Sequence, residues 1–186
     1  DVSADGSFAV ASWQVPAAGA ALRSVLVRID IATGERTVIA DDPGADLGHP
    51  AISPDGTTVA YLRETHSTPE QAPRITLCTK AFGGEPVELA ADWDRWPASV
   101  TWSHDGSTLL VTADDNGRAP IFAVDPSSGA VTQLTHDDFA YGEVRPVPGG
   151  ALYALRSSYL TPPHPVRVDA DGSVTVLPCV EFPELP

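Results

Sequence analysis

A four-residue turn signature recurs through this chain at a fixed interval, and it limits the possible folds more than any other feature. Ser3-Ala4-Asp5-Gly6 returns as Ser53-Pro54-Asp55-Gly56 and as Ser103-His104-Asp105-Gly106, 50 residues apart each time. A degenerate fourth copy, Val147-Pro148-Gly149-Gly150, keeps the glycine but lacks the aspartate. An Asp-Gly step suits a tight hairpin, because glycine adopts positive φ freely and aspartate caps the turn. Self-similarity at this period indicates one repeated supersecondary unit.

A second glycine recurs once in every unit, and short apolar segments separate the two kinds of turn. These segments are bounded by turn formers and are rich in β-branched residues, while helical periodicity is weak throughout, so they predict strands. The second glycines are Gly34, Gly84, Gly129 and Gly172. The expected strands are 8–11, 25–29 and 37–39; 50–52, 59–62, 75–78 and 87–89; 99–102, 109–111, 121–124 and 131–134; and 143–145, 151–155, 166–168 and 174–177.

Each unit therefore consists of a strand, an Asp-Gly turn, a strand, a loop, a strand, a glycine turn and a final strand. This order is typical of one β-propeller blade, so the chain is predicted to be all-β with about four four-stranded antiparallel blades. The first turn begins at Ser3, so the innermost strand of the first blade is expected to be missing or a stub. The expected blades are 1–46, 47–96, 97–140 and 141–180.

The blade set is expected to be a partial ring, the C-terminal part of a larger propeller. Four blades lie at the low end for a closed ring, and one of these four is incomplete. The chain also contains no methionine, so we expect it to be a segment of a longer protein. Because open sheet edges are templates for pairing, self-association through the ends of the blade set is a further expectation.

The charge and cysteine content exclude several function classes. The formal net charge is −14, which argues against nucleic acids and anionic membrane surfaces as partners. No apolar run reaches the roughly 18 residues that a membrane span requires. Cys78 and Cys179 are too few for a disulfide framework or a zinc cluster. We expect both cysteines to be buried and the compartment to be reducing and cytoplasmic.

Two motifs suggest chemistry that their context argues against. Ser103-His104-Asp105 has the residue types of a serine-protease triad, but triad members normally come from separated places in the chain. Here the three residues are one copy of the turn signature. Asp169-Ala170-Asp171-Gly172 begins like a calcium loop but lacks the later ligands. The histidines show no metal-ligand spacing, so we expect no catalytic residue, no metal site and no cofactor.

Several runs carry a resemblance to known families. The repeated Ser-Pro-Asp-Gly before an apolar strand resembles the TolB-like propeller repeat. Longer runs resemble the propeller domains of prolyl oligopeptidase-family serine peptidases, in particular the acylaminoacyl-peptidase-like branch. These runs are 91–97, 113–122, 154–159 and 163–167, of which Trp93-Asp94-Arg95-Trp96-Pro97 and Arg156-Ser157-Ser158-Tyr159 are the more specific.

The resemblance implies an accessory role in a parent enzyme. In that family the propeller precedes an α/β-hydrolase domain, whose nucleophile elbow has the pattern Gly-x-Ser-x-Gly. This chain has no such pattern, and a proline-rich stretch at 178–186 stands where the hydrolase would begin. The resemblance therefore implies a non-catalytic segment that caps the active site and admits only short peptides. The implied partners are the peptide substrate and the hydrolase domain of the same polypeptide.

Chain direction places all the expected turns on one face of the blades and the longer loops on the other. Function collects on long loops carried by a rigid scaffold. Trp93, Asp94, Arg95 and Trp96 are the first candidates for an interface or for substrate gating, because Trp and Arg are favoured at interfaces. The alternative is that the tryptophans wedge between adjacent blades and Arg95 forms a local salt bridge. Second candidates are Arg156, Tyr159 and His164, whose alternative is a polar rim around the central channel.

Two other functions stay open at this point. One is a TolB-like propeller that binds a protein partner and belongs to no enzyme. The other is a lactonase-like propeller enzyme, which would need carboxylates and asparagines converging on a metal in the channel. The inner strands contain no such set. Whether the gene continues into a hydrolase with a nucleophile elbow distinguishes the peptidase segment from the binding module.

Overall fold

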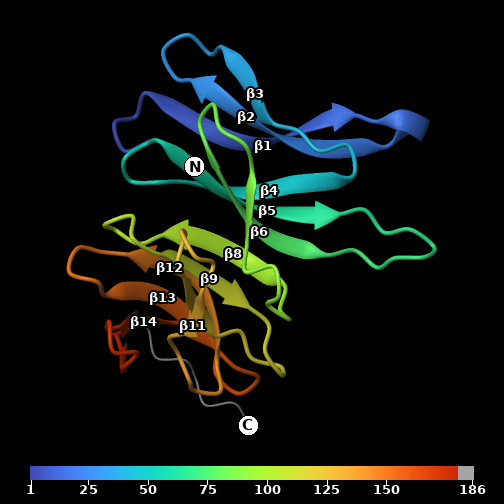
Figure 1. Ribbon diagram of the computed structural model, residues 1–186. Helices are drawn as coiled ribbons and strands as arrows, with labels where there is room; N and C mark the ends of the chain where they lie inside the picture. Colours follow the sequence, from blue (N-terminus) through green and yellow to red (C-terminus); the bar gives the residue numbers. More distant parts are fainter. Residues whose placement is uncertain (180–186) are drawn as a thin grey trace.

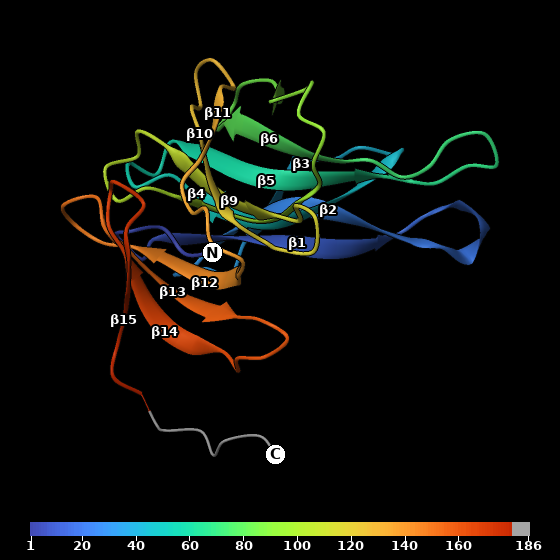
Figure 2. The same cartoon turned by 90° about the horizontal axis from the view of Figure 1, so that it is seen from below.

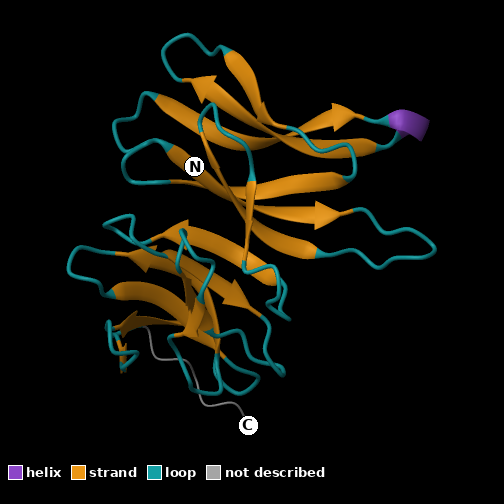
Figure 3. Cartoon of the chain, viewed as in Figure 1, coloured by secondary structure: helices purple, strands orange, loops and turns teal. Residues whose placement is uncertain are grey.

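The computed structural model describes residues 1–179 and shows four antiparallel sheets arranged one beside the next (Figures 1 and 3). One short 3-10 helix, η1 (Ala18–Ala20), interrupts the strands in the described part. The all-β prediction is confirmed. The strands are β1 (Phe8–Pro16), β2 (Leu22–Asp30), β3 (Arg36–Ala40), β4 (Ala45–Ile52), β5 (Thr58–Thr65), β6 (Ile75–Ala81), β7 (Val87–Leu89), β8 (Pro97–Trp102), β9 (Leu109–Ala113), β10 (Ile121–Val124), β11 (Val131–Gln133), β12 (Ala140–Pro146), β13 (Leu152–Ser157), β14 (His164–Val168) and β15 (Val174–Val176).

Each sheet is one blade whose strands pair in chain order. Blades 2, 3 and 4 have the orders β4-β5-β6-β7, β8-β9-β10-β11 and β12-β13-β14-β15. Blade 1 has only β1-β2-β3, and a single bridge from Val2 to Ala9 stands in the place of its innermost strand, as the sequence predicts. β4 begins at Ala45 and β12 at Ala140, slightly before the expected boundaries at 47 and 141.

The turn signature forms because the aspartate satisfies the backbone of its own turn. In blade 3, Asp105 accepts hydrogen bonds from the Ser103 hydroxyl at 2.7 Å and from the Ser107 amide at 3.0 Å. Gly106 has a φ of 73°, a conformation that suits glycine because it lacks a Cβ. Asp5 and Asp55 accept the same pair of bonds in blades 1 and 2.

The core consists of three apolar clusters, each formed between neighbouring blades. The first joins blades 1 and 2 around Val10, Leu26 and Tyr61. The second joins blades 2 and 3, where the Trp102 indole also donates to the Ala51 carbonyl at 3.0 Å. The third joins blades 3 and 4 around Ile121. Stability therefore depends on the contact between blades, as in other repeat proteins.

The connections on the two faces of the blade set differ in length and in composition. The loops after β1, β5, β9 and β13 and the links between blades lie on one face, here called the loop face. The Asp-Gly turns and the later glycine turns lie on the opposite face, here called the turn face. The β1–β2 and β5–β6 hairpins extend to the same side in both views (Figures 1 and 2). The face assignment derived from chain direction therefore agrees with the strand order.

The two cysteines differ in their surroundings. Cys78 is buried in β6, and burial raises the pKa of its thiol. Cys179 is exposed beyond β15, so the expectation that both cysteines are buried is wrong for Cys179. β15 ends at Val176, so Cys179 lies outside the strands of blade 4. Within residues 1–179, no helix has the length and apolar character to span a membrane. Most of the proline-rich stretch lies outside the described residues.

Candidate functional site

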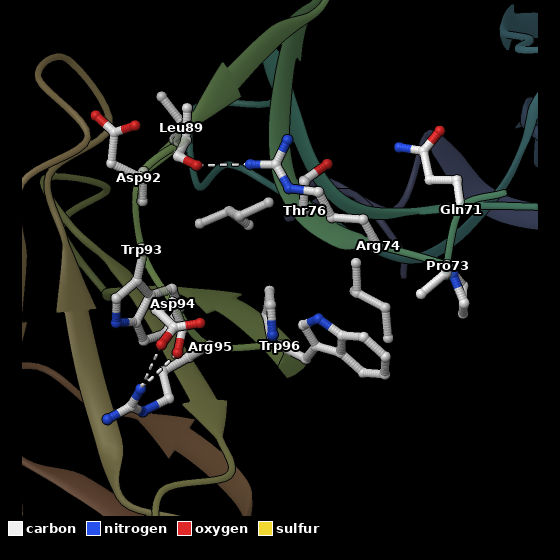
Figure 4. A pocket seen from close by; sticks show the side chains of 16 residues that line it. Gln71, Pro73, Arg74, Thr76, Leu89, Asp92, Trp93, Asp94, Arg95 and Trp96 are labelled. Atoms are coloured by element: carbon white, nitrogen blue, oxygen red, sulfur yellow. Dashed lines mark hydrogen bonds and ion pairs between the residues drawn. The ribbon is translucent and has the colours of Figure 1, made fainter. Parts of the chain in front are cut away.

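The link between blades 2 and 3 lines a hollow of about 640 Å³ on the loop face. Residues 89–97 form one wall, and residues 71–77, from the end of the β5–β6 loop into β6, form the other. Figure 4 shows Trp93 and Trp96 pointing to opposite sides of the link. The four consecutive candidates therefore separate into inward and outward groups.

Trp93 and Arg95 hold the link in place. The Trp93 ring packs on the cluster between blades 2 and 3 and meets the Phe122 ring edge-on, with centroids 4.9 Å apart. The Arg95 guanidinium binds the Asp115 carboxylate of the β9–β10 loop at 2.9 Å. Trp93 thus wedges between the two blades and Arg95 forms a local salt bridge, as in the alternative interpretation of the sequence.

Trp96 and Asp94 face solvent. Trp96 is 53% exposed, which is high for a tryptophan, and the Asp94 side chain is fully exposed. On the opposite wall Arg74 binds the Ala91 carbonyl at 2.6 Å and the Glu88 carboxylate at 3.1 Å. Trp96 and Asp94 thus add an exposed indole ring and an exposed carboxylate to a hollow whose lining also includes the exposed residues Gln71, Arg74 and Asp92. The Asp94 carboxylate lies 3.8 Å from the Arg95 guanidinium.

Arg156 lies at the centre of a second cluster, between blades 3 and 4. It donates to Asp137 at 2.9 Å and to the His164 Nε2 at 3.3 Å, and its guanidinium lies 4.0 Å from the Phe139 ring centroid. The Tyr141 hydroxyl donates to the same Asp137 oxygen at 2.8 Å. Burial, followed by this hydrogen bond, raises the pKa of Tyr141.

Cross-strand register explains why Arg156 and His164 meet. Arg156 is the last but one residue of β13 and His164 begins β14, and the two residues are direct partners in the ladder. His164 is buried, and its Nδ1 lies 3.0 Å from the Pro162 carbonyl. Tyr159 does not belong to this cluster, because its side chain is fully exposed in the β13–β14 loop. The three second candidates thus form one pair and one isolated residue.

Pairs of adjacent aspartates in two links form clamps that sequence reasoning missed. In each pair, one aspartate binds an arginine of the preceding blade and the other binds an arginine of the following blade. In the link between blades 2 and 3 the positions of acid and base are exchanged, because Arg95 lies on the link and Asp115 on the following blade. The clamp pairs are Asp41–Arg23, Asp42–Arg63, Asp138–Arg118 and Asp137–Arg156. The sequence did carry a signal for these clamps, because two adjacent aspartates follow the outer strand of blade 1 and again that of blade 3.

Ser103, His104 and Asp105 form a turn and are not arranged as a catalytic triad. His104 is exposed, while Ser103 and Ser107 donate to Asp105. These hydrogen bonds lower the pKa of Asp105 to about 2. Within the described residues, no three His, Cys, Asp or Glu side chains come together in a way that could hold a metal ion.

Comparison with curated proteins identifies peptidases as relatives of part of this chain. It is 38% identical over 76 residues to "Probable dipeptidyl-peptidase 5" of Arthroderma benhamiae, a match that spans 40% of this chain and 10% of that protein. A protein with the same description from Aspergillus clavatus is 36% identical over 92 residues, which are 45% of this chain and 13% of the relative. The chain thus spans about a tenth of the length of these relatives. No family model matches it.

Solved structures with the same fold include peptidase propellers and TolB. Puromycin hydrolase matches with a TM-score of 0.72 at 18% identity, over 94% of this chain and 29% of that one. Pyrococcus horikoshii acylaminoacyl peptidase matches with a TM-score of 0.68 at 14% identity, over 94% and 26%. TolB of Acinetobacter baumannii matches with a TM-score of 0.65 at 21% identity, over 83% and 38%. The β-propeller fold and the resemblance to prolyl oligopeptidase-family and TolB-like propellers are confirmed.

Proposed function

We propose that this chain is a non-catalytic propeller segment of a prolyl oligopeptidase-family serine peptidase, and that it caps the active site and admits only short peptides. The observation that carries the proposal is the 38% identity with dipeptidyl-peptidase 5 in a chain with the propeller fold. The peptide substrate and a hydrolase domain of the same polypeptide are the partners that this proposal requires.

The loop face supports a capping role because its links are fixed across blades. Arg95 and Arg156 each bind an aspartate about twenty residues away in sequence, and each pair joins a link to the blade that follows it. If the loop face is to exclude long peptides, its blades must not move apart at that face. Ion pairs between adjacent blades oppose such a movement. Trp96 and Asp94 project from this face and are the side chains we assign to contact with peptide or hydrolase.

Serine-directed labelling tests whether the parent protein is a peptidase. The protein expressed from the complete gene is treated with a fluorophosphonate probe and assayed with dipeptide reporter substrates. We expect covalent labelling and cleavage by that protein, and neither by the 186-residue chain alone. A folded parent protein that neither labels nor cleaves contradicts the proposal.

The second candidate function is a TolB-like module that binds a protein partner. The match to Acinetobacter baumannii TolB, which covers 38% of that chain, favours it. The same labelling experiment separates the two functions, because a binding module carries no activated serine. The peptidase is preferred because the sequence identity to dipeptidyl-peptidase 5 is higher.

A cytoplasmic location is part of this proposal. Both cysteines are free thiols, and such thiols persist in a reducing compartment. Fractionation of cells that express the tagged gene tests the location, and recovery of the protein from the medium contradicts it.

A further inference from the structure

Three large side chains fill the space between blades 1 and 2 on the turn face. Phe8 of β1 meets Phe82 of the β6–β7 turn edge-on, with ring centroids 5.4 Å apart. The Arg28 guanidinium of β2 lies 4.2 Å from the Phe8 centroid and 5.8 Å from the Phe82 centroid. Two aromatic rings and one cation thus form a plug between these blades.

The repeat identifies the residues that take these three places between blades 3 and 4. Phe8 follows Gly6 by two positions, and Thr108 follows Gly106 by the same interval. Phe82 precedes Gly84 as Ala170 precedes Gly172. Arg28 pairs with Val10 across the ladder of blade 1, and Ala123 pairs with Leu110 at the same register in blade 3. Every member of the plug is therefore replaced by a much smaller side chain.

A cleft of about 440 Å³ lies where the plug is missing. Thr108, Ala123 and Ala170 all line it, and its floor is apolar, with Leu110, Leu134 and Leu152. The degenerate turn of blade 4 contributes to the opening. A Cβ placed on Gly106 would lie 3.3 Å from Pro54 of the preceding blade, whereas one on Gly150 would meet only Ala170 of its own blade within 4 Å. The volume falls in the usual range of small-molecule sites.

The rim of the cleft is acidic. Asp105 and Asp169 line its mouth together with His104, and no lysine or arginine is among the described residues that line it. Asp169 is bound by Arg167 at 2.7 Å, whereas Asp105 accepts only from groups of its own turn. The cleft therefore combines an apolar interior with carboxylates at the mouth, where a bound cation is favoured over an anion.

We propose that this cleft binds a small planar aromatic ligand that carries a cationic group, in the place that Phe8, Phe82 and Arg28 fill between blades 1 and 2. The ring occupies the space of the two phenylalanines, and the cation takes the place of the guanidinium beside the acidic rim. The site lies on the turn face, opposite the hollow assigned to the parent enzyme, and it does not depend on the proposed function.

Calorimetric titration of the full chain with 2-phenylethylammonium tests the proposal. We expect saturable binding at one site per chain. 3-Phenylpropionate, which has the same ring and a negative charge, should bind roughly two- to fivefold more weakly, the range expected for an exposed charge interaction. Butylammonium, a cation without a ring, should show no saturable binding.

Ala170→Phe restores one ring of the plug and is expected to abolish binding. Ala32→Phe is the matched control, because Ala32 is an exposed alanine two positions before Gly34 in the corresponding turn of blade 1 and lies away from the cleft. Far-UV circular dichroism verifies folding, and Ala170→Leu replaces Ala170→Phe should the larger side chain unfold the protein. Absence of saturable binding of 2-phenylethylammonium to the parent chain, or unchanged binding to a folded Ala170 variant, overturns the proposal.

Discussion

The turn face and the loop face use their charged residues in opposite ways. On the turn face, the carboxylate of each signature aspartate is stabilised within its own turn by hydroxyl and amide donors two residues away. On the loop face, aspartates bind arginines that lie 18 to 21 positions away and belong to neighbouring blades. The aspartates of the turn face therefore shape single blades, and those of the loop face join neighbouring blades.

This difference explains why the residues of the turn face repeat more regularly in the sequence than those of the loop face. A turn needs the same residue types in every blade, because its geometry is the same each time. A clamp between blades needs only opposite charges at the right place, so the link to blade 3 can exchange the positions of acid and base at Arg95 and Asp115. We accordingly assign the contact with peptide or hydrolase to the less regular loop face.

The largest effect is expected where a clamp is most buried. Arg156→Met leaves the Asp137 carboxylate without its cation, and one oxygen of that carboxylate is already buried without a partner in the described structure. We expect a loss of about 3 kcal/mol in the free energy of unfolding, because an uncompensated charge remains partly buried. Urea denaturation measures it, and a loss below about 1 kcal/mol would show that the clamp is dispensable.

The two tryptophans of the blade 2–3 link should respond differently to the same substitution. Trp93→Leu removes a ring that packs on Phe122, so we expect a loss of about 2 kcal/mol. Trp96→Leu removes an exposed ring and should change stability by less than about 0.5 kcal/mol. Thermal denaturation of both variants provides the comparison. Equal losses would contradict the separation of the link into inward and outward residues.

The turn face should contribute to stability in a pH-dependent way. Hydrogen bonds from Ser103 and Ser107 lower the pKa of Asp105 from its ordinary value of 3.8 to about 2. Because the pKa is depressed in the folded state, the stabilisation is fully present above pH 3.8 and is lost as the pH falls through about 2. Asp105→Ala should therefore lower Tm at pH 6, and the difference from the parent chain should shrink between pH 4 and pH 2. A difference that does not depend on pH would contradict this cause.

The smallest effect is expected from an arginine whose pair is exposed. Arg145 binds Glu143 at 2.8 Å on the inner strand of blade 4, but the two side chains are 69% and 66% exposed. Arg145→Met should cost no more than about 0.5 kcal/mol, since water screens such pairs. This variant is the matched control for Arg156→Met in the same blade. A loss as large as that of Arg156→Met would indicate that burial does not distinguish the two pairs.

The strands and turns could be predicted because the repeat makes the same physical demand in every blade. Each expected segment overlaps an observed strand, from Phe8 in blade 1 to Val176 in blade 4. The links repeat only in part, because two carry adjacent aspartates and the third carries Arg95 instead. The direction of Trp93 and the acid that binds Arg156 were therefore not predicted from the repeat. The expectation that Cys179 is buried was wrong because Cys179 lies beyond the end of β15, whereas Cys78 lies within β6. The meeting of Arg156 with His164 required the register of one hairpin.

Peptide-length selectivity of the parent enzyme is the most direct test of the capping role assigned to the loop face. The ratio of kcat/KM for a long peptide to that for a dipeptide is compared between the parent, Trp96→Ala and Ile31→Ala. Ile31 is as exposed as Trp96, at 53%, but lies on the turn face. We expect Trp96→Ala to raise this ratio and Ile31→Ala to leave it unchanged. An unchanged ratio in a folded Trp96→Ala enzyme would contradict the assignment.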